Sequence, residues 1–141
     1  MFNSITFLVP ETARGKHRPV VTRGGRHTYT PDVAGWGEAI GWYATQATGR
    51  PMWEGPISIH FSVTRQMPKS WSNKMKAKMD GQWCLTRPDV VNIGALICDA
   101  LEGILYHEDK TVVSITGTKR WGYHAITEIG VEQLESYDSS Y

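Results

Sequence analysis

Apolar positions along the chain predict four β-strands. A short apolar run at residues 4–10 ends at a proline and predicts the first strand. Residues 57–65 alternate strictly between apolar and polar, as expected for a strand with one buried face. Two further strands are expected at residues 111–121 and 124–134, on either side of a turn at Gly122-Tyr123. The buried face of the second strand would consist of Ile57, Ile59, Phe61 and Val63.

Three other segments have the features of helices. Thr30-Pro31-Asp32 supplies an N-cap hydroxyl, a proline at the first helical position and an acid in the first turn, and Gly49-Arg50-Pro51 ends this helix. A short helix within residues 67–82 is expected to be capped by Ser70. This short helix carries three lysines: Lys74, Lys76 and Lys78. The third segment, residues 91–104, contains the candidate chemistry.

On a helical wheel at about 100° per residue, residues 91–104 divide into a core-facing side and a polar side. The core-facing side consists of Ile93, Leu96, Ile97, Ala100, Leu101 and Ile104. The opposite side holds Asn92, Asp99 and Glu102. Val91 and Ala95, at i and i+4, lie beside these polar residues, where charged groups would be expected. Gly103 predicts the end of the helix.

The balance of charge differs between the two parts of the chain. Residues 1–87 hold 12 Lys/Arg and 5 Asp/Glu, a balance of +7, whereas residues 88–141 hold 3 and 9, a balance of −6. Bases and β-formers alternate around Gly24-Gly25, which predicts a basic hairpin at about residues 20–30. A basic part joined to an acidic part indicates one surface that meets a polyanion and another that holds acids for a different task.

The order strand–helix–strand–helix–helix–strand–strand predicts the fold class. We expect one α/β (α+β) domain over residues 1–141, with a single-layer mixed sheet flanked by helices and a frayed tail at 134–141. No apolar run approaches the roughly 20 residues of a membrane span. Cys84 and Cys98 lack the spacing of metal ligands, so two reduced thiols of a cytosolic protein are expected.

Two groups of acids flank the predicted helix at residues 91–104. Asp89 stands just before it, where its carboxylate would cap the helix or face a ligand. Glu108-Asp109 forms either an ordinary acidic turn or a second source of carboxylates. If the following strand packs beside the helix, the two groups would converge, and convergent carboxylates are ligands for Mg²⁺. Next to a basic surface, such a metal would serve phosphodiester hydrolysis.

The segment PDVVNIGALICDALEGILYHEDKTVV resembles the motif of the RusA family of Holliday junction resolvases, common in phages and prophages. That motif runs Asp-x-Asp-Asn, then Lys three residues after the Asn, Asp-Ala-Leu, and a paired acid before a β-branched strand. Upstream, RPVVTRGGRHTYTP resembles the basic segment of the family, and MPKSWSNKMKAKMDGQ resembles its helix before the motif. The resemblance covers nearly the whole chain in the right order.

The resemblance implies a structure-selective endonuclease that resolves four-way DNA junctions by paired nicking, as a C2 homodimer, in the cytoplasm of a bacterial host cell. The cofactor implied is Mg²⁺, with Mn²⁺ as an alternative. Asp89 and Asp109 match the metal-binding acids of the family, with Glu108 and Asp99 as further candidates. The DNA contacts are expected from Arg14, Lys16, Arg18, Arg23 and Arg26, and secondarily from Lys74, Lys76 and Lys78.

Two positions depart from the family motif. Val91 stands where the family has its second metal-binding Asp, and Ala95 stands where it has the catalytic Lys. The helical wheel singles out the same two residues. We therefore expect impaired cutting, and the alternative function is a non-catalytic protein that binds junctions with the same fold. Natural loss, introduced substitutions and rescue of the ligand sphere by Glu108 or Asp99 are all compatible with the sequence, and a small phage protein without a DNA role is a remoter alternative.

Overall fold

The computed structural model describes residues 3–15, 20–21, 27–28 and 31–135. The predicted elements occur in the predicted order. They are β1 (Ser4–Val9), β2 (Val20–Val21), β3 (His27–Thr28), α1 (Pro31–Thr48), β4 (Ile57–Gln66), α2 (Asn73–Met79), α3 (Val90–Leu101), a 3-10 turn (Asp109–Thr111), β5 (Val112–Gly122) and β6 (Ile126–Gln133). β2 and β3 pair antiparallel, as the predicted basic hairpin requires, although its turn lies outside the described residues.

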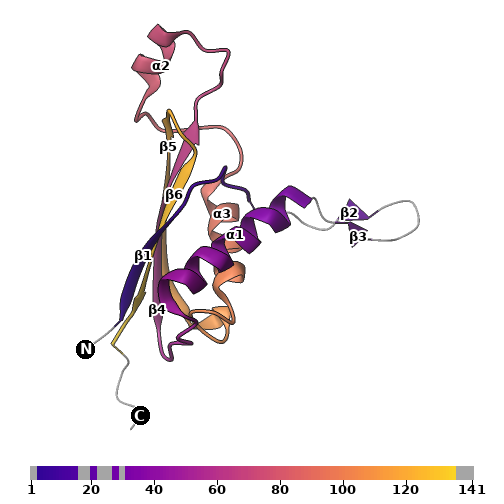
Figure 1. The fold of residues 1–141 in the computed structure, drawn as a ribbon, viewed down its shortest axis with the longest axis vertical. Coiled ribbons are helices and arrows are strands. Elements are labelled where there is room, and N and C mark those ends of the chain that lie inside the picture. Colours follow the sequence, from indigo (N-terminus) through magenta and orange to yellow (C-terminus); the bar gives the residue numbers. More distant parts are fainter. Residues whose placement is uncertain (1–2, 16–19, 22–26, 29–30, 136–141) are drawn as a thin grey trace.

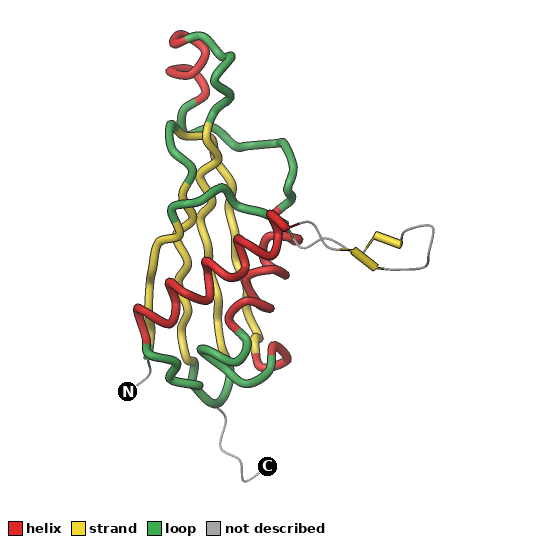
Figure 2. The backbone as a smooth tube through the Cα atoms, turned by 45° about the vertical axis from the view of Figure 1, so that its right-hand side comes forward, coloured by secondary structure: helices red, strands yellow, loops and turns green. Residues whose placement is uncertain are grey.

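Four strands form one mixed sheet in the order β1-β6-β4-β5. β6 pairs antiparallel with both β1 and β4, whereas β5 pairs parallel with β4 and forms an edge of the sheet. α1 and α3 pack together on one face of this sheet, and no helix of the described residues covers the opposite face (Figures 1 and 2). The predicted fold class, a mixed sheet with helices in an α+β arrangement, is confirmed.

The core lies between the sheet and the two helices. The predicted face of β4 is buried, because its apolar side chains point toward α1 and α3. α1 contributes Trp36 and Ile40, whose side chains are buried in this layer. α3 contributes Ile93, Leu96, Ile97 and Leu101, in agreement with the helical wheel. The arrangement leaves the polar side of α3 facing outward.

Two predicted helix ends differ from the structure. The N-cap of α2 is Ser72 rather than Ser70, because the Ser72 hydroxyl accepts a hydrogen bond from the Met75 amide at 3.1 Å. α3 ends at Leu101 instead of residue 104, since Glu102 is extended and Gly103 takes a positive φ of 80°. The predicted role of Gly103 in ending the helix is confirmed, and Ile104 packs on the core from the turn that follows.

Residues 67–86, here called the arm, extend beyond the sheet between β4 and α3 and carry α2 at the far end (Figure 1). The base of the arm has a small core of its own, which contains Met67, Cys84 and Trp121. The Cys84 amide donates to the Lys119 carbonyl at 3.0 Å, and the Trp121 amide donates to the Gln82 carbonyl at 2.9 Å. These antiparallel contacts attach the arm to the end of β5. No helix within the described ranges is long and apolar enough to span a membrane.

Candidate DNA-binding site and acidic residues

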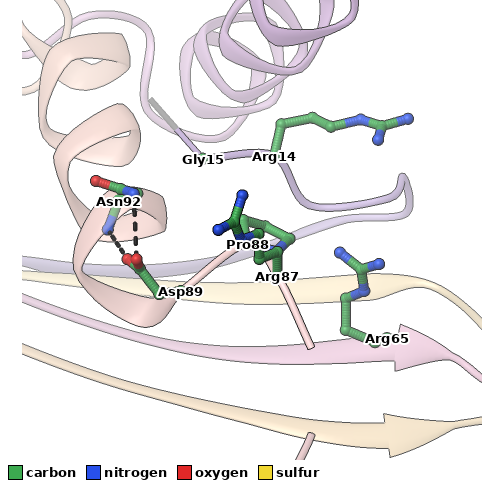
Figure 3. Close-up of a pocket in the computed structure, with 7 residues that line it drawn as sticks. All are labelled: Arg14, Gly15, Arg65, Arg87, Pro88, Asp89 and Asn92. Carbon is green, nitrogen blue, oxygen red and sulfur yellow. Dashed lines mark hydrogen bonds between the residues drawn. The ribbon is translucent and has the colours of Figure 1, made fainter. Parts of the chain in front are cut away.

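Asp89 caps the N-terminus of α3. Its backbone is extended, and its Oδ1 accepts a hydrogen bond from the Asn92 amide at 2.8 Å. The Asn92 side-chain amide donates to the other carboxylate oxygen at 3.2 Å (Figure 3). The capping role foreseen from the sequence is therefore present. The carboxylate is also exposed, so capping leaves it accessible from solvent.

Three arginines gather around this capped helix start. Arg14 follows β1, Arg65 comes from the end of β4, and Arg87 stands in the loop before α3. Together with Gly15, Pro88, Asp89 and Asn92 they line a pocket of about 540 Å³, here called the arginine pocket (Figure 3). Three guanidinium groups outnumber the one carboxylate. Because guanidinium groups bind phosphate oxygens in a bidentate manner, the arginine pocket suits a phosphate.

The arginine pocket depends on a close backbone approach at Gly15. A Cβ at this position would lie 3.0 Å from the Cβ atoms of both Asn92 and Pro88. Real Cβ contacts are rarely so short, so a glycine lets the segment after β1 pass directly beside the start of α3. Arg14 reaches the arginine pocket because its neighbour has no side chain.

A buried lysine holds the loop that leads into Asp89. Lys119, on the helix-covered face of β5 beside Val63, is only 8% exposed. Its ammonium donates hydrogen bonds to two backbone carbonyls, those of Thr86 and Pro88, the latter at 2.7 Å. These two carbonyls lie on either side of Arg87. Lys119 thus fixes the backbone of the residues that present both Arg87 and Asp89 to the arginine pocket.

The second group of acids lies at the other end of α3. The Asp109 amide donates to the Glu102 carboxylate at 3.0 Å, and Glu108 pairs with Lys110 at 3.2 Å. Burial raises the pKa of the Cys98 thiol, and the nearby charges of Asp109 and Asp99 raise it further. Cys98 therefore stays a neutral thiol, and its surroundings show that these acids gather around the last turn of α3.

The structure does not bring Asp89 and Asp109 together within one chain. Asp89 caps the first turn of α3, whereas the Asp109 amide is hydrogen-bonded to Glu102, just after the last turn, and the 12 residues of α3 between them rise about 18 Å. Nowhere in the described ranges do three His, Cys, Asp or Glu side chains form a group able to hold a metal ion. Asp89 is the one acid among the residues that line the arginine pocket, and three guanidinium groups line it as well. The residues at Asp89 of one chain therefore do not fit a divalent cation.

Val91 and Ala95 lie on the outer side of α3, between the two groups of acids. The Val91 side chain is 80% exposed, and Ala95 is partly buried. Both residues line an apolar pocket of about 360 Å³ that Gly94, Cys98 and Ile115 help to form. An apolar pocket between α3 and the sheet therefore lies where the motif would have an acid and a base.

The model of the family described as Endodeoxyribonuclease RusA matches residues 10–132 of this chain. The chain belongs to the RusA endodeoxyribonuclease family. It is also similar to the "Uncharacterized protein YqaN" of Bacillus subtilis (strain 168), with 28% identity over 129 residues, which cover 88% of this chain and 91% of that protein. The family resemblance read from the motif is confirmed.

The structure describes some of the residues that were expected to contact DNA. Arg14 lines the arginine pocket. Lys16, Arg18, Arg23 and Arg26 have side chains outside the described part of the structure. Lys74 and Lys78 on α2 are exposed, and Lys76 is half-buried. All three lysines lie on the arm.

Sequence reasoning missed Arg65, Arg87 and Lys119. The alternation of β4 places Arg65 on the same face as its buried residues, which was an available indication that this arginine points toward the helices. Arg87 directly precedes the Pro-Asp of the RusA motif. Nothing local marks Lys119, because its two acceptors lie more than 30 residues away in the sequence.

Proposed function

We propose that this chain is a RusA-type protein that binds four-way DNA junctions and has little cutting activity of its own. The arginine pocket carries the proposal, because it places three phosphate-binding side chains beside the acid that begins the family motif. Phosphate contacts of this kind hold a DNA strand in position without reading its bases. The family supplies the substrate class, branched DNA, and the reaction class, phosphodiester hydrolysis.

The impairment follows from two side chains. An isopropyl group at position 91 offers no oxygen to a cation, and a methyl group at position 95 cannot stabilise negative charge that develops on a phosphate or a leaving oxygen. Both substitutions lie on the outer side of α3, where the family motif has an acid and a base. The competing function, resolution by paired nicking, requires another source of ligands and charge, for which Glu108 and Asp99 are the candidates.

A homodimer is part of the proposal, since paired cuts on opposed strands need two sites. The interface has two candidate locations, either the strand at residues 111–121 or the helix near Trp36. Trp36 is only 2% exposed, so its side chain cannot meet a partner. By contrast, β5 is an edge strand with two exposed apolar side chains, Val113 (63%) and Ile115 (48%). These observations favour β5.

A two-fold interface on β5 would also bring acids together that are separated within one chain. If α3 of one chain lies antiparallel to α3 of a second copy, Asp89 of each copy approaches the acids around Asp109 of the other. The arrangement would give two equivalent groups of acids per dimer, one for each strand to be nicked. Asp89 and Asp109 would then act together in the dimer, although they are far apart in one chain.

Binding should depend on salt through the arginine pocket. The Arg65→Gln/Arg87→Gln variant should make the negative slope of log affinity against log salt concentration shallower by about two. Each phosphate contact releases counterions and contributes about −0.9 to this slope. Gel shifts with a four-way junction and a linear duplex at several salt concentrations measure this, and the parent chain should prefer the junction.

The matched control for the arginine pocket is Arg50→Gln/Lys110→Gln. It removes two positive charges from residues that do not line the pocket, so it should leave the slope close to that of the parent. If both double variants reduce the slope equally, binding follows the overall charge and the arginine pocket is not the phosphate site. If the parent shifts neither DNA, the proposed function itself is wrong.

The oligomeric state should depend on the exposed apolar side chains of β5. Light scattering at micromolar concentration should report about twice the chain mass of 15.8 kDa, and Ile115→Glu should yield monomers because it places a charge in the interface. The control is Leu8→Glu, at a side chain that is 49% exposed on β1, the other edge strand, and it should stay dimeric. A parent chain that is monomeric yet binds junctions would exclude the dimer.

A further inference from the structure

We propose that the arm carries a nucleobase-stacking site centred on Trp83, which receives a base displaced at the crossover of a branched DNA. This inference rests on the proposed function, because it names a further part of the same substrate. The site is separate from the arginine pocket, and no residue lines both.

Trp83 exposes much of its aromatic ring to solvent, where a base can stack on it. The indole is 55% exposed, although it stands beside the small core of the arm. The Arg120 guanidinium lies over the ring, 3.7 Å from its centroid, and is itself held by a hydrogen bond to the Gly81 carbonyl at 2.8 Å. One side of the indole is therefore supported by a fixed cation, while more than half of the side chain stays in solvent. A supported ring is a preorganised surface for stacking.

The surroundings of Trp83 fit a base joined to a phosphate. Trp83 and Leu85 line a shallow pocket of about 460 Å³ together with Lys78, Met79 and Gln82. Leu85 is 91% exposed, so it forms an exposed apolar patch together with Trp83. The apolar part of this pocket suits a flat heteroaromatic ring, and the Lys78 ammonium is available to the phosphate attached to it.

The positive charge of the arm favours nucleic acid over other ligands of this pocket. The arm holds Lys69, Lys74, Lys76 and Lys78 but a single acid, Asp80. An apolar pocket within a positive surface is the combination that binds single-stranded nucleic acid, in which aromatic side chains stack on bases and lysines follow the backbone. When the arms of a four-way junction are unstacked, the bases next to the crossover lose a stacking neighbour, so they are the ones that reach Trp83 at the lowest cost.

The test compares Trp83→Ala, Trp83→Phe and the parent chain in binding to a four-way junction. Loss of one stacked base should weaken junction binding about 10-fold or more for Trp83→Ala, whereas Trp83→Phe should stay within about threefold of the parent. The salt slope should not change, because stacking releases no counterions. Trp42→Ala, which removes a 58% exposed tryptophan from α1, is the matched control and should bind like the parent.

Photocrosslinking locates the base directly. A junction that carries 5-iododeoxyuridine at the crossover should form an adduct at Trp83, identified by mass spectrometry, and the same probe at the end of a junction arm should not. A short single strand serves as a second ligand, since the stacking site should bind it even without junction selectivity. Trp83-dependent binding of the single strand together with no junction binding would support the stacking site and overturn the proposed function.

Other results overturn the stacking site. If Trp83→Ala binds junction and single strand like the parent, or if the crossover adduct forms at another residue, no base stacks on Trp83. An equal loss on junction and linear duplex with a lower salt slope would show that the arm acts by charge alone. If Trp83→Ala changes the molecular mass measured by light scattering, this surface contacts a second copy of the chain instead.

Discussion

The double variant Val91→Asp/Ala95→Lys is expected to nick four-way junctions in Mg²⁺, whereas the parent chain should cut them little or not at all. The two changes introduce the carboxylate and the ammonium that the resemblance to the RusA motif implies at these positions. Each restored group should recover about 100-fold or more in rate, because removal of a single charge-stabilising group from an active site typically costs that much. Cleavage of a labelled junction on a denaturing gel, with and without Mg²⁺, measures the gain.

The fold should tolerate both restorations. Position 91 is 80% exposed in the first turn of α3, where a negative charge is favourable to the helix dipole. Position 95 is partly buried on the same outer side, one turn further on, so a lysine can lay its stem along the surface and extend its ammonium toward the carboxylate at i−4. Thermal melts of the single and double variants should therefore lie close to that of the parent.

A third substitution provides the control. Asp89→Asn in the double variant should abolish the recovered cutting, because an amide is a poor ligand for a divalent cation in place of a carboxylate. Asparagine caps helices about as well as aspartate, so α3 should still begin at the same residue. A double variant that folds and binds junctions but does not cut would show that the metal site has been assigned to the wrong residues.

The fold follows from local sequence patterns more closely than the site does. Strand β4 was predictable because its apolar residues alternate and one face is buried, and α3 was predictable because its apolar arc is complete. Local pattern determines both. The N-cap of α2 was misplaced by two residues, since Ser70 and Ser72 are equivalent caps until the Met75 amide is located.

The site depends on contacts that no local pattern contains. Arg14, Arg65 and Arg87 come from three separate segments and meet only through the packing of β1, β4 and the loop before α3. The expected convergence of Asp89 and Asp109 within one chain failed for a related reason. The chain turns at Gly103, after the full length of α3, so the acids that follow remain beside Glu102 at the far end of the helix.

Lys119→Met should destabilise the protein more than Lys110→Met, which changes the lysine just before β5. The ammonium donates to the carbonyls of Thr86 and Pro88, and hydrogen bonds from a charged donor contribute about 1.5–3 kcal/mol each. Part of this gain is offset by the cost of burying the ammonium, so we expect a net loss of about 2–3 kcal/mol in the free energy of unfolding. For a domain of this size, Tm should fall by roughly 6–10 °C.

Lys110→Met is the matched control, because the Lys110 side chain is 77% exposed and pairs only with an exposed carboxylate in the described part of the structure. An exposed pair of this kind contributes little, so this variant should melt within about 2 °C of the parent. If Lys119→Met melts equally close to the parent, solvent has replaced the ammonium at both carbonyls, and Lys119 does not fix the loop.

A double-mutant cycle separates positioning of Asp89 from general stability. If Lys119 acts by holding Pro88 in place, the loop that presents Asp89 is displaced in Lys119→Met, and the cap of α3 is already weakened. Asp89→Ala should then cost about 1 kcal/mol in the parent and clearly less in the Lys119→Met background. The Asn92 amide donates a hydrogen bond to the Asp89 carboxylate at 2.8 Å, so its hydrogen exchange should accelerate in both single variants. Strictly additive free energies, together with unchanged exchange at Asn92 in Lys119→Met, would show that the buried lysine stabilises β5 without positioning the acid.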